Sequence, residues 1–444
     1  MNVEDRRPRL SVVTAVLVFL AARVAILIVR DPFFDELFTV WMARQPFSRI
    51  IPLLLNDSGP PLYYFLARFD SVTALRCLSL LFACAQFVLV ARFSWTAALL
   101  LAVYPPAALF AVDARAYALC GLFVTAGVLA RQPYLKAVSF VLAAYSHYYG
   151  VLFFPLPLAG EGALKGRVRA FLLTLVLFIP GFYMASQQPA AATAWVDEPL
   201  YAPLVNLSFA GRYPEALFTP APLVLVIVSL VLLVISAAES GRLARSRRAS
   251  RPATDGDRAG RALAAGETPA LLAVLVPIVL AIAFQLAGRP VYFPMRFEAV
   301  LAGPLVLLLA NARPRFVIPL TLIGAYVITA GAIDHYRRPP DPYREAALVL
   351  KRNAKPVDTI VATGYLYLET VVALERSVIA WPAEQALHPG WRATSGDLSE
   401  LPKGTFLWIG ERGAPELHRL RGVRSVQPLF TNERAMIALT RPLN

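Results

Sequence analysis

The sequence predicts an all-α protein that crosses a membrane many times and carries a small α/β domain at its C-terminus. Of its 444 residues, 57% are hydrophobic and only 16% are charged, against roughly 25% charged in an ordinary soluble domain. The mean hydropathy is +0.57, and apolar runs of spanning length recur along most of the chain. These observations exclude a disordered chain and argue against a soluble enzyme.

The apolar runs predict about eleven transmembrane helices, because a segment in lipid must satisfy its own backbone hydrogen bonds. The runs lie near residues 10–29, 72–91, 95–111, 115–130, 134–146, 149–162, 168–186, 221–237, 269–287, 298–311 and 316–332. The fifth and sixth are short for spanning, so we expect one of them to be tilted or partly embedded. Together these runs define a membrane domain over residues 1–334.

The basic residues predict the orientation, because Lys and Arg are enriched in cytoplasmic loops. With the N-terminus in the cytoplasm, basic residues fall on the cytoplasmic side at every crossing. The Arg-rich segment 238–267 is predicted to be a flexible cytoplasmic loop. The net charge of +14 is then a topology signal that also attracts anionic membrane lipids. It does not predict nucleic-acid binding, which needs one solvated basic face interleaved with aromatic residues.

Residues 335–444 differ from the rest, since charges and turns replace the apolar runs. Short buried strands are predicted at 358–363, 377–381, 405–409 and 435–439, and helices at 343–352 and 414–421. This pattern predicts a small soluble α/β domain on the outer face of the membrane.

The densest group of polar residues lies in the first outer loop, residues 31–71. It carries Asp35 and Glu36 between aromatic residues, then Asp57 and the run Pro60-Pro61-Leu62-Tyr63-Tyr64. Carboxylates at a membrane surface are costly unless paired or used, so Asp35 and Glu36 are candidate functional residues. The alternative is a pair of solvated interfacial acids beside an aromatic belt.

Three more polar clusters fall on the predicted outer edge. They are Asp113, Arg115 and Tyr117; Tyr145, His147 and Tyr148; and Arg289, Tyr292, Arg296 and Glu298. Fixed cations can stabilise a departing phosphate, and a carboxylate can take the proton of an attacking hydroxyl. The clusters therefore suit group transfer from a lipid-linked phosphate. Interfacial tyrosines and snorkelling arginines are the plainer alternative.

The acids have a second chemistry open to them. Asp35, Glu36 and Asp57 could hold Mg²⁺ or Mn²⁺ through oxygen ligands, and the sequence does not choose between base and metal ligand. It contains no Walker-type phosphate loop, dinucleotide fingerprint, His-Glu-x-x-His pair or Gly-x-Ser-x-Gly elbow. Nucleotide hydrolysis and protease or lipase chemistry therefore have no support.

In their order along the chain these clusters resemble the GT-C superfamily of integral-membrane glycosyltransferases. The resemblance is to the bacterial branch similar to protein O-mannosyltransferases and lipid A aminoarabinose transferases, glycosyltransferase family 39. It covers residues 10–332 and rests on Phe34-Asp35-Glu36 with Thr39, Asp57 with Pro60 to Tyr64, Arg76 with Ser79, Asp113-x-Arg115-x-Tyr117, Tyr145-x-His147-Tyr148, Trp195, and Arg296-Phe297. The chain departs from the family pattern at Asp113, where Glu is usual, at Gly59, where His is common, and at Phe297, which lacks a tyrosine hydroxyl.

The resemblance implies a GT-C-like fold and an inverting glycosyltransferase at the periplasmic face of the bacterial inner membrane. The donor would be a polyprenyl-phosphate sugar and the acceptor a lipid, glycan or protein. Asp35 would be the catalytic base or a metal-linked carboxylate, supported by Glu36 and Asp57. The donor phosphate and lipid would contact Arg115, His147, Arg296, Tyr63, Tyr64, Tyr117, Asp113 and Tyr148.

Two other functions remain open from the sequence. A multi-pass transporter or flippase of a lipid-linked or anionic substrate would need ionisable residues near the membrane midplane, where Arg23 is the main example. No pair of interrupted helices in matching halves supports that reading. A noncatalytic relative whose outer domain binds a partner is the third possibility, and the intact Asp35-Glu36 pair argues against it.

Overall fold

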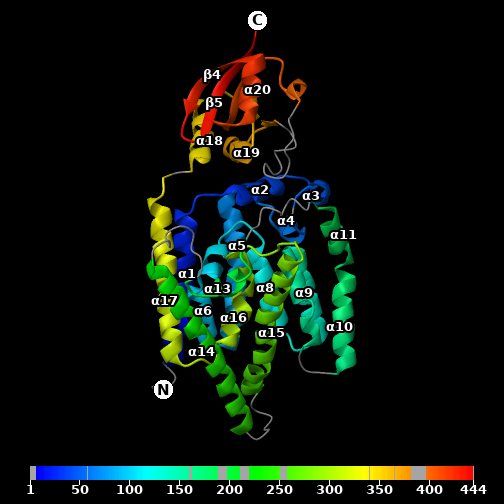
Figure 1. The fold of residues 1–444 in the computed structure, drawn as a ribbon, viewed down its shortest axis with the longest axis vertical. Coiled ribbons are helices and arrows are strands. Elements are labelled where there is room, and N and C mark those ends of the chain that lie inside the picture. The colour runs from blue at the N-terminus through cyan, green and yellow to red at the C-terminus, as the bar shows by residue number, and fades with distance from the viewer. Residues whose placement is uncertain are drawn as a thin grey trace. The chain divides into compact units, whose positions relative to one another are not determined.

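The computed structural model describes most of the chain and divides it into two compact units (Figure 1). The described residues are 7–57, 59–159, 163–188, 198–210, 220–250, 258–339, 341–364, 366–381 and 397–443. The first unit, here called the membrane unit, comprises Met1–Arg30, Gly59–Leu66 and Thr73–Arg337. The second, here called the sheet unit, comprises Asp31–Ser58, Ala67–Val72 and Arg338–Asn444.

The membrane unit is helical. Its elements are α1 (Arg7–Val29), α4 (Leu62–Leu66), α5 (Val72–Phe93), α6 (Trp95–Val103), α7 (Pro105–Phe110), α8 (Tyr117–Leu129), α9 (Pro133–Ser146), η2 (Tyr148–Phe153), η3 (Leu156–Leu158), α10 (Leu164–Leu177), α11 (Ile179–Gln187), α13 (Ala202–Val205), α14 (Pro220–Ser250), α15 (Arg258–Leu286), α16 (Arg296–Leu308) and α17 (Pro314–Arg337). Among the described residues, four helices are long and apolar enough to cross a membrane, and two bent helix pairs raise this to six. The chain is therefore a multi-pass membrane protein, while the expected count of about eleven spans is not confirmed.

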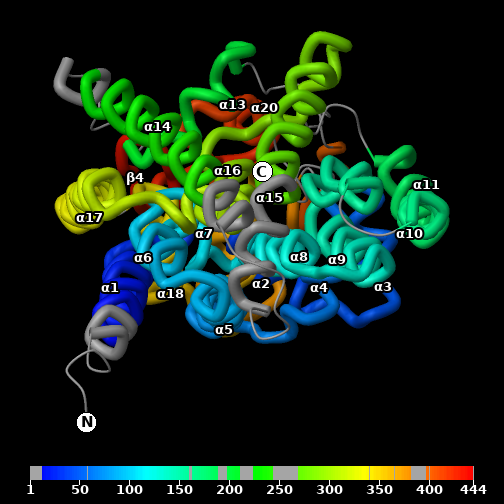
Figure 2. The backbone as a smooth tube through the Cα atoms, turned by 90° about the horizontal axis from the view of Figure 1, so that it is seen from below, coloured from blue at the N-terminus to red at the C-terminus, as the bar shows by residue number. Residues whose placement is uncertain are grey.

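Helix α16 lies in the interior of the membrane unit, where it packs against α6, α7, α8 and α15 (Figure 2). All of its residues from Phe297 to Leu308 are buried. Its 13 residues span only about 20 Å at 1.5 Å per residue. The helix is therefore a core element, and its first residue, Arg296, stands where that core begins.

The run at 95–111, expected to be one span, is broken into α6 and α7 at Pro105 and Pro106. Because proline has no backbone N–H, the break leaves the carbonyls of Leu101 and Ala102 without their helical donors. Arg23 supplies both: Nη2 donates to Leu101 O at 3.0 Å, and Nη1 donates to Ala102 O. Its guanidinium also lies 4.0 Å from the ring centroid of Phe19. Arg23 therefore supplies the two hydrogen-bond donors that the prolines remove at the break.

Two other expected segments differ in the structure. Residues 149–162 were predicted to span, but they begin with the two short 3₁₀ helices η2 and η3. A Cβ at Gly150 would lie 2.2 Å from Ala144 N, so this segment folds back closely on α9. The predicted flexible loop at 238–267 is also partly helical, because α14 continues to Ser250 and α15 begins at Arg258. Its Ala, Arg and Leu residues are strong helix formers.

The sheet unit contains α2 (Phe34–Ala43), α3 (Phe47–Leu54), α18 (Pro342–Asn353), β1 (Ile360–Ala362), α19 (Leu366–Leu374), β2 (Ile379–Ala380), η5 (Leu398–Glu400), β3 (Phe406–Glu411), α20 (Pro415–Val423), β4 (Arg424–Thr431) and β5 (Ala435–Pro442). The strand order is β2-β1-β3-β5-β4. Strands β2, β1 and β3 are parallel, and β5 is antiparallel to β3 and β4. The C-terminal region is therefore a small α/β sheet, as expected.

Helices cover both faces of this sheet. Alternate residues of each strand point to opposite sides, so each face presents apolar side chains to a helix. On one face, Ala346 and Leu350 of α18 and Leu366 of α19 pack with Ile360, Ala362, Leu407, Ile409 and Ile437. On the other face, Leu417 and Leu420 of α20 pack with Val361, Phe406, Trp408, Met436 and Ala438. The sheet is thus the middle layer of three.

The first loop was expected to belong with the membrane helices, but residues 31–58 fold with the sheet unit. Helix α2 packs against α19, and Arg44 Nη1 donates to the carbonyl of Val371 at 3.1 Å. An ion pair also joins Asp31 to Arg344 of α18. These contacts, which are distant in sequence, bring the loop into the C-terminal unit. The division between the two units falls between Arg337 and Arg338, three residues after the predicted boundary at residue 334.

Candidate functional site

The cationic residues expected to hold a phosphate lie at breaks between helices of the membrane unit. Arg115 is in the turn between α7 and α8, His147 stands between α9 and η2, and Arg296 begins α16. All three side chains are partly exposed. Helix ends leave backbone groups and polar side chains outside the helical hydrogen-bond pattern, so these positions can reach a ligand.

Arg115 is held by two tyrosines and a serine. Its Nη1 donates to Tyr64 Oη at 2.9 Å. Tyr63 Oη lies 3.0 Å from Ser79 Oγ, and Ser79 Oγ donates to Arg115 O at 3.3 Å. The rings of Tyr63 and Tyr64 meet edge to face with centroids 6.2 Å apart. The predicted residues Tyr63, Tyr64 and Arg115 therefore form one connected group.

Aromatic rings join His147 and Arg296. The ring of Tyr117 lies 5.0 Å from that of His147 and 5.8 Å from Arg296 Cζ. Arg296 Cζ is also 5.5 Å from the ring of Phe293, and His147 lies 4.3 Å from the ring of Tyr149. An arginine over an aromatic face is attracted by the ring quadrupole. Tyr149 and Phe293 were not among the predicted site residues. Tyr149 follows the predicted Tyr148, and Phe293 lies three residues before Arg296.

His147 is neutral in this setting. Burial, together with the positive charges of Arg115 and Arg296, lowers its pKa to about 3. Its Nδ1 accepts the backbone N–H of Tyr149 at 3.2 Å, so the single proton of the neutral ring is on Nε2. The cluster of Arg115, His147 and Arg296 therefore offers two guanidinium groups and an imidazole N–H donor, and it suits an anionic ligand.

Asp113 lies two residues before Arg115 in the same turn. It is fully buried and forms an ion pair with Arg30, at the end of α1. The backbone carbonyl of Arg30 in turn accepts a hydrogen bond from Arg76 Nη1 at 2.8 Å. Asp113 thus fixes the turn that carries Arg115, whose N–H donates to Asp113 O at 2.7 Å. Tyr148, also predicted, is partly exposed and begins η2 next to His147.

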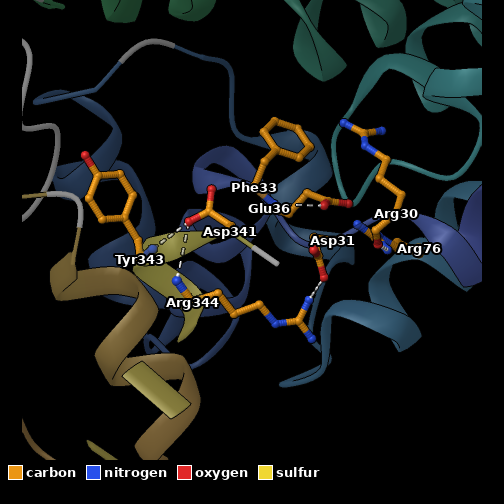
Figure 3. Close-up of polar contacts among 8 residues, drawn as sticks. All are labelled: Arg30, Asp31, Phe33, Glu36, Arg76, Asp341, Tyr343 and Arg344. Atoms are coloured by element: carbon orange, nitrogen blue, oxygen red, sulfur yellow. Dashed lines mark hydrogen bonds and ion pairs between the residues drawn. The ribbon is translucent and has the colours of Figure 1, made fainter. Parts of the chain in front are cut away.

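The predicted acids belong to the sheet unit, where Asp35 and Glu36 occupy the first turn of α2. Glu36 is buried, and its Oε2 accepts the backbone N–H of Phe33 at 3.4 Å (Figure 3). This contact caps the helix. Asp35 is partly exposed, and its backbone carbonyl accepts from Thr39 Oγ1 at 3.0 Å. The two neighbouring acids therefore differ: Glu36 is buried and caps the helix, whereas Asp35 is partly exposed.

Asp57, the third predicted acid, is buried and follows α3. Across the described residues, no group of three His, Cys, Asp or Glu side chains is placed to hold a metal ion. The metal-ligand role of Asp35, Glu36 and Asp57 stays a prediction. Trp195 of the predicted pattern lies outside the described residues.

A polar group in the sheet unit was not predicted. Arg344 pairs with Asp31, and Asp341 Oδ1 caps α18 by accepting the N–H groups of Tyr343 and Arg344 at 2.8 and 3.4 Å (Figure 3). Burial and, to a smaller extent, the negative charge of Asp341 raise the pKa of Glu369 to about 8, although Arg344 acts in the opposite direction. Glu369 lies within the apolar helix α19, so the sequence around it did not predict that it would belong to this polar group.

Comparisons with known proteins give a distant likeness of fold. No protein-family model and no curated protein matches this sequence. A crystal structure of ArnT from Cupriavidus metallidurans in the apo state is 13% identical with a TM-score of 0.48, over 99% of this chain and 98% of that one. The same protein bound to undecaprenyl phosphate is 14% identical with a TM-score of 0.44, over 97% of each chain.

Proposed function

We propose that this chain is a membrane glycosyltransferase that moves a sugar from a polyprenyl-phosphate donor to a lipid, glycan or protein acceptor. The observation that carries the proposal is the cluster of Arg115, Arg296 and neutral His147 at helix ends of a membrane unit. A lipid phosphate combines an anion with an apolar chain, and this cluster combines cations with apolar helices. We place the reaction at the periplasmic face of a bacterial inner membrane.

The cations would act on the leaving group. As the bond from the anomeric carbon to the phosphate oxygen breaks, negative charge collects on the departing phosphate. Arg115, Arg296 and the Nε2 proton of His147 would stabilise that charge through charge-assisted hydrogen bonds. Because these donors are fixed before the reaction, their reorganisation costs little in the transition state. Tyr63, Tyr64 and Tyr117 would line the lipid or sugar groove.

The base in this proposal is Asp35, on the strength of its motif and its partly exposed position. An acceptor hydroxyl attacks the anomeric carbon, its oxygen forms the new glycosidic bond, and its proton passes to Asp35. The polyprenyl phosphate leaves with the electron pair of the broken bond, and direct displacement inverts the anomeric centre. Nearby negative charge also favours the oxocarbenium-like transition state. Glu36 supports Asp35 by capping α2.

The test is release of free polyprenyl phosphate from labelled polyprenyl-phosphate sugars by the purified full-length chain. A membrane extract supplies the unidentified acceptor, and parallel reactions contain Mg²⁺, Mn²⁺ or a chelator. We expect release by the unaltered chain and by the control Asp70→Asn, an exposed aspartate of the same unit, and none by Asp35→Asn. Equal rates for Asp35→Asn and the unaltered chain would remove Asp35 from the reaction. No release from any donor would contradict the glycosyltransferase itself.

The transporter alternative gains no support from the one ionisable residue predicted near the membrane midplane. That residue, Arg23, is 1% exposed and donates to the carbonyls of Leu101 and Ala102. The need for hydrogen-bond donors at the helix break explains why Arg23 is buried there, and no substrate pathway is needed to explain it.

A further inference from the structure

The start of α16 has a backbone conformation that needs support. Met295, directly before the helix, has φ of +67°, a left-handed conformation that side-chain-bearing residues rarely adopt. Such a residue persists only where its surroundings hold it in place. Arg296 is the next residue, so whatever holds Met295 also decides where the Arg296 guanidinium lies.

Hydrogen bonds fix the chain on both sides of Arg296, two of them from other segments and one within the turn itself. Before it, Asn206 Nδ2 donates to Tyr292 Oη at 2.7 Å, and the backbone N–H of Phe293 donates to Tyr149 Oη at 3.1 Å. After it, Glu298 Oε1 accepts from Tyr292 Oη at 2.6 Å. Tyr292 and Glu298 are 1% and 0% exposed. The Tyr292–Glu298 bond therefore closes a buried loop around Met295 and Arg296.

Glu298 does not act as a counter-charge aimed at Arg296. Residues two apart on a helix point about 200° away from each other, and the observed contacts agree with this. Arg296 faces the rings of Tyr117 and Phe293, whereas Glu298 faces Tyr292. A fully buried carboxyl group is costly in a membrane protein and is usually kept for a specific purpose. Here the carboxyl group of Glu298 accepts the hydrogen bond that closes the turn. The guanidinium of Arg296 meanwhile faces Tyr117 in the cluster.

We propose that Glu298 is a positioning residue whose hydrogen bond from Tyr292 locks the turn at Met295 and so holds Arg296 in the phosphate-binding cluster. The inference rests on the proposed function, because it assumes that Arg296 binds the phosphate of the donor lipid. It adds Glu298, Tyr292 and Asn206 to the residues that determine donor affinity, although none of them would touch the donor.

The experiment measures the Kd of an undecaprenyl phosphate probe for the purified full-length chain, with undecaprenol as the ligand lacking phosphate. We expect Arg296→Ala and Glu298→Ala each to weaken binding of the phosphate about tenfold, and Glu298→Gln, which keeps the acceptor for Tyr292, to stay within about twofold. Glu239→Gln is the matched control: Glu239 is another buried glutamate of the membrane unit, paired with Arg313 and Arg315. It is expected to bind like the unaltered chain.

The double variant separates positioning from general destabilisation. If Glu298 acts through Arg296, then Glu298→Ala has no further effect once Arg296 is alanine, since residues acting as one unit are not additive. Full additivity, or unchanged affinity in Glu298→Ala, would overturn the positioning role. Unchanged affinity in Arg296→Ala would instead contradict the phosphate role of Arg296 itself. Should Glu298→Ala fail to fold, Tyr292→Phe removes the same hydrogen bond and takes its place in the cycle.

Discussion

Arg23 donates from Nη2 to the carbonyl oxygen of Leu101 at 3.0 Å, at the point where Pro105 cannot supply a backbone donor. Removing the guanidinium would leave two carbonyls unsatisfied in an apolar interior, at about 1–3 kcal/mol each. We therefore expect Arg23→Met to lower the free energy of unfolding by roughly 2 kcal/mol or more. Thermal unfolding of the purified chain in detergent measures this.

A rescue variant makes the Arg23 prediction specific. Pro105→Ala with Pro106→Ala restores backbone N–H groups to the segment, so in the Arg23→Met background it should recover part of the lost stability. If Arg23→Met were as stable as the unaltered chain, the two carbonyls would have other donors and our account of the break would be wrong.

Arg115→Ala should weaken binding of polyprenyl phosphate about tenfold, because a charge-assisted hydrogen bond contributes about 1.5–3 kcal/mol. Asp35→Asn should bind the same lipid with nearly unchanged affinity while losing transfer. The control is Arg169→Ala, an exposed arginine of the membrane unit outside the predicted clusters. Equal losses in Arg115→Ala and Arg169→Ala would point to general charge attraction and would remove Arg115 from a defined phosphate site.

Glu36 and Asp35 should respond differently to substitution. Glu36→Ala removes the cap at Phe33 N, so we expect a loss of about 1 kcal/mol in the stability of α2, read from faster hydrogen exchange of its amides. Glu36→Gln keeps an acceptor oxygen and should retain transfer activity. Loss of transfer in Glu36→Gln with unchanged exchange would show that Glu36 takes part in the chemistry.

The stability of the membrane unit should depend on pH through His147. Its pKa in the folded chain is about 3, below its ordinary value of 6.5, so the unfolded chain binds more protons between these values. The contribution of neutral His147 is therefore complete above pH 6.5 and is lost as the pH falls toward 3, by up to about 1.4 kcal/mol per unit. Unfolding temperatures between pH 8 and 4 test this, and His147→Gln should flatten the profile. An identical slope in both proteins would contradict it.

Glu369 predicts the opposite trend in the sheet unit. Its folded pKa of about 8 lies above its ordinary value of 4.5, so the folded state holds the extra proton and loses stability as the pH rises from 4.5 to 8. Glu369→Gln should therefore slow hydrogen exchange of the β1 and β3 amides at pH 8.5 and change it little at pH 4.5. Faster exchange at pH 8.5 in the variant would show that ionised Glu369 is stabilised by its neighbours.

Local pattern was enough to predict much of this chain. Most helices of the membrane unit fall on the predicted apolar runs, and the order of helix ends placed Arg115, His147 and Arg296 on one edge. Strands β1, β3 and β5 are buried runs bounded by turns. The structure brings Arg115, Arg296 and the neutral His147 together, while the role of each residue stays a prediction for the experiments above.

The features that were missed depend on contacts distant in sequence. Helix α19 is an apolar run with two adjacent valines, Val371 and Val372, and apolar periodicity alone does not separate such a run from a strand. Strand β4 contains Pro428 and is largely exposed, which argues against a strand unless the strand lies at an edge. The pairing of Arg23 with Leu101 and of Tyr292 with Glu298 could be found only once the helices were packed.

The sheet unit is assembled from stretches that flank the membrane helices, and this restricts how the chain threads the bilayer. Residues 31–58 and 338–444 belong to one compact unit, so we expect both to emerge on the same side of the membrane. We therefore predict that the chain between Val72 and Arg338 makes an even number of membrane passages. The four long helices alone satisfy this parity. If the bent pair α10 and α11 is a fifth passage, at least one shorter helix such as α8 or α9 must supply a sixth.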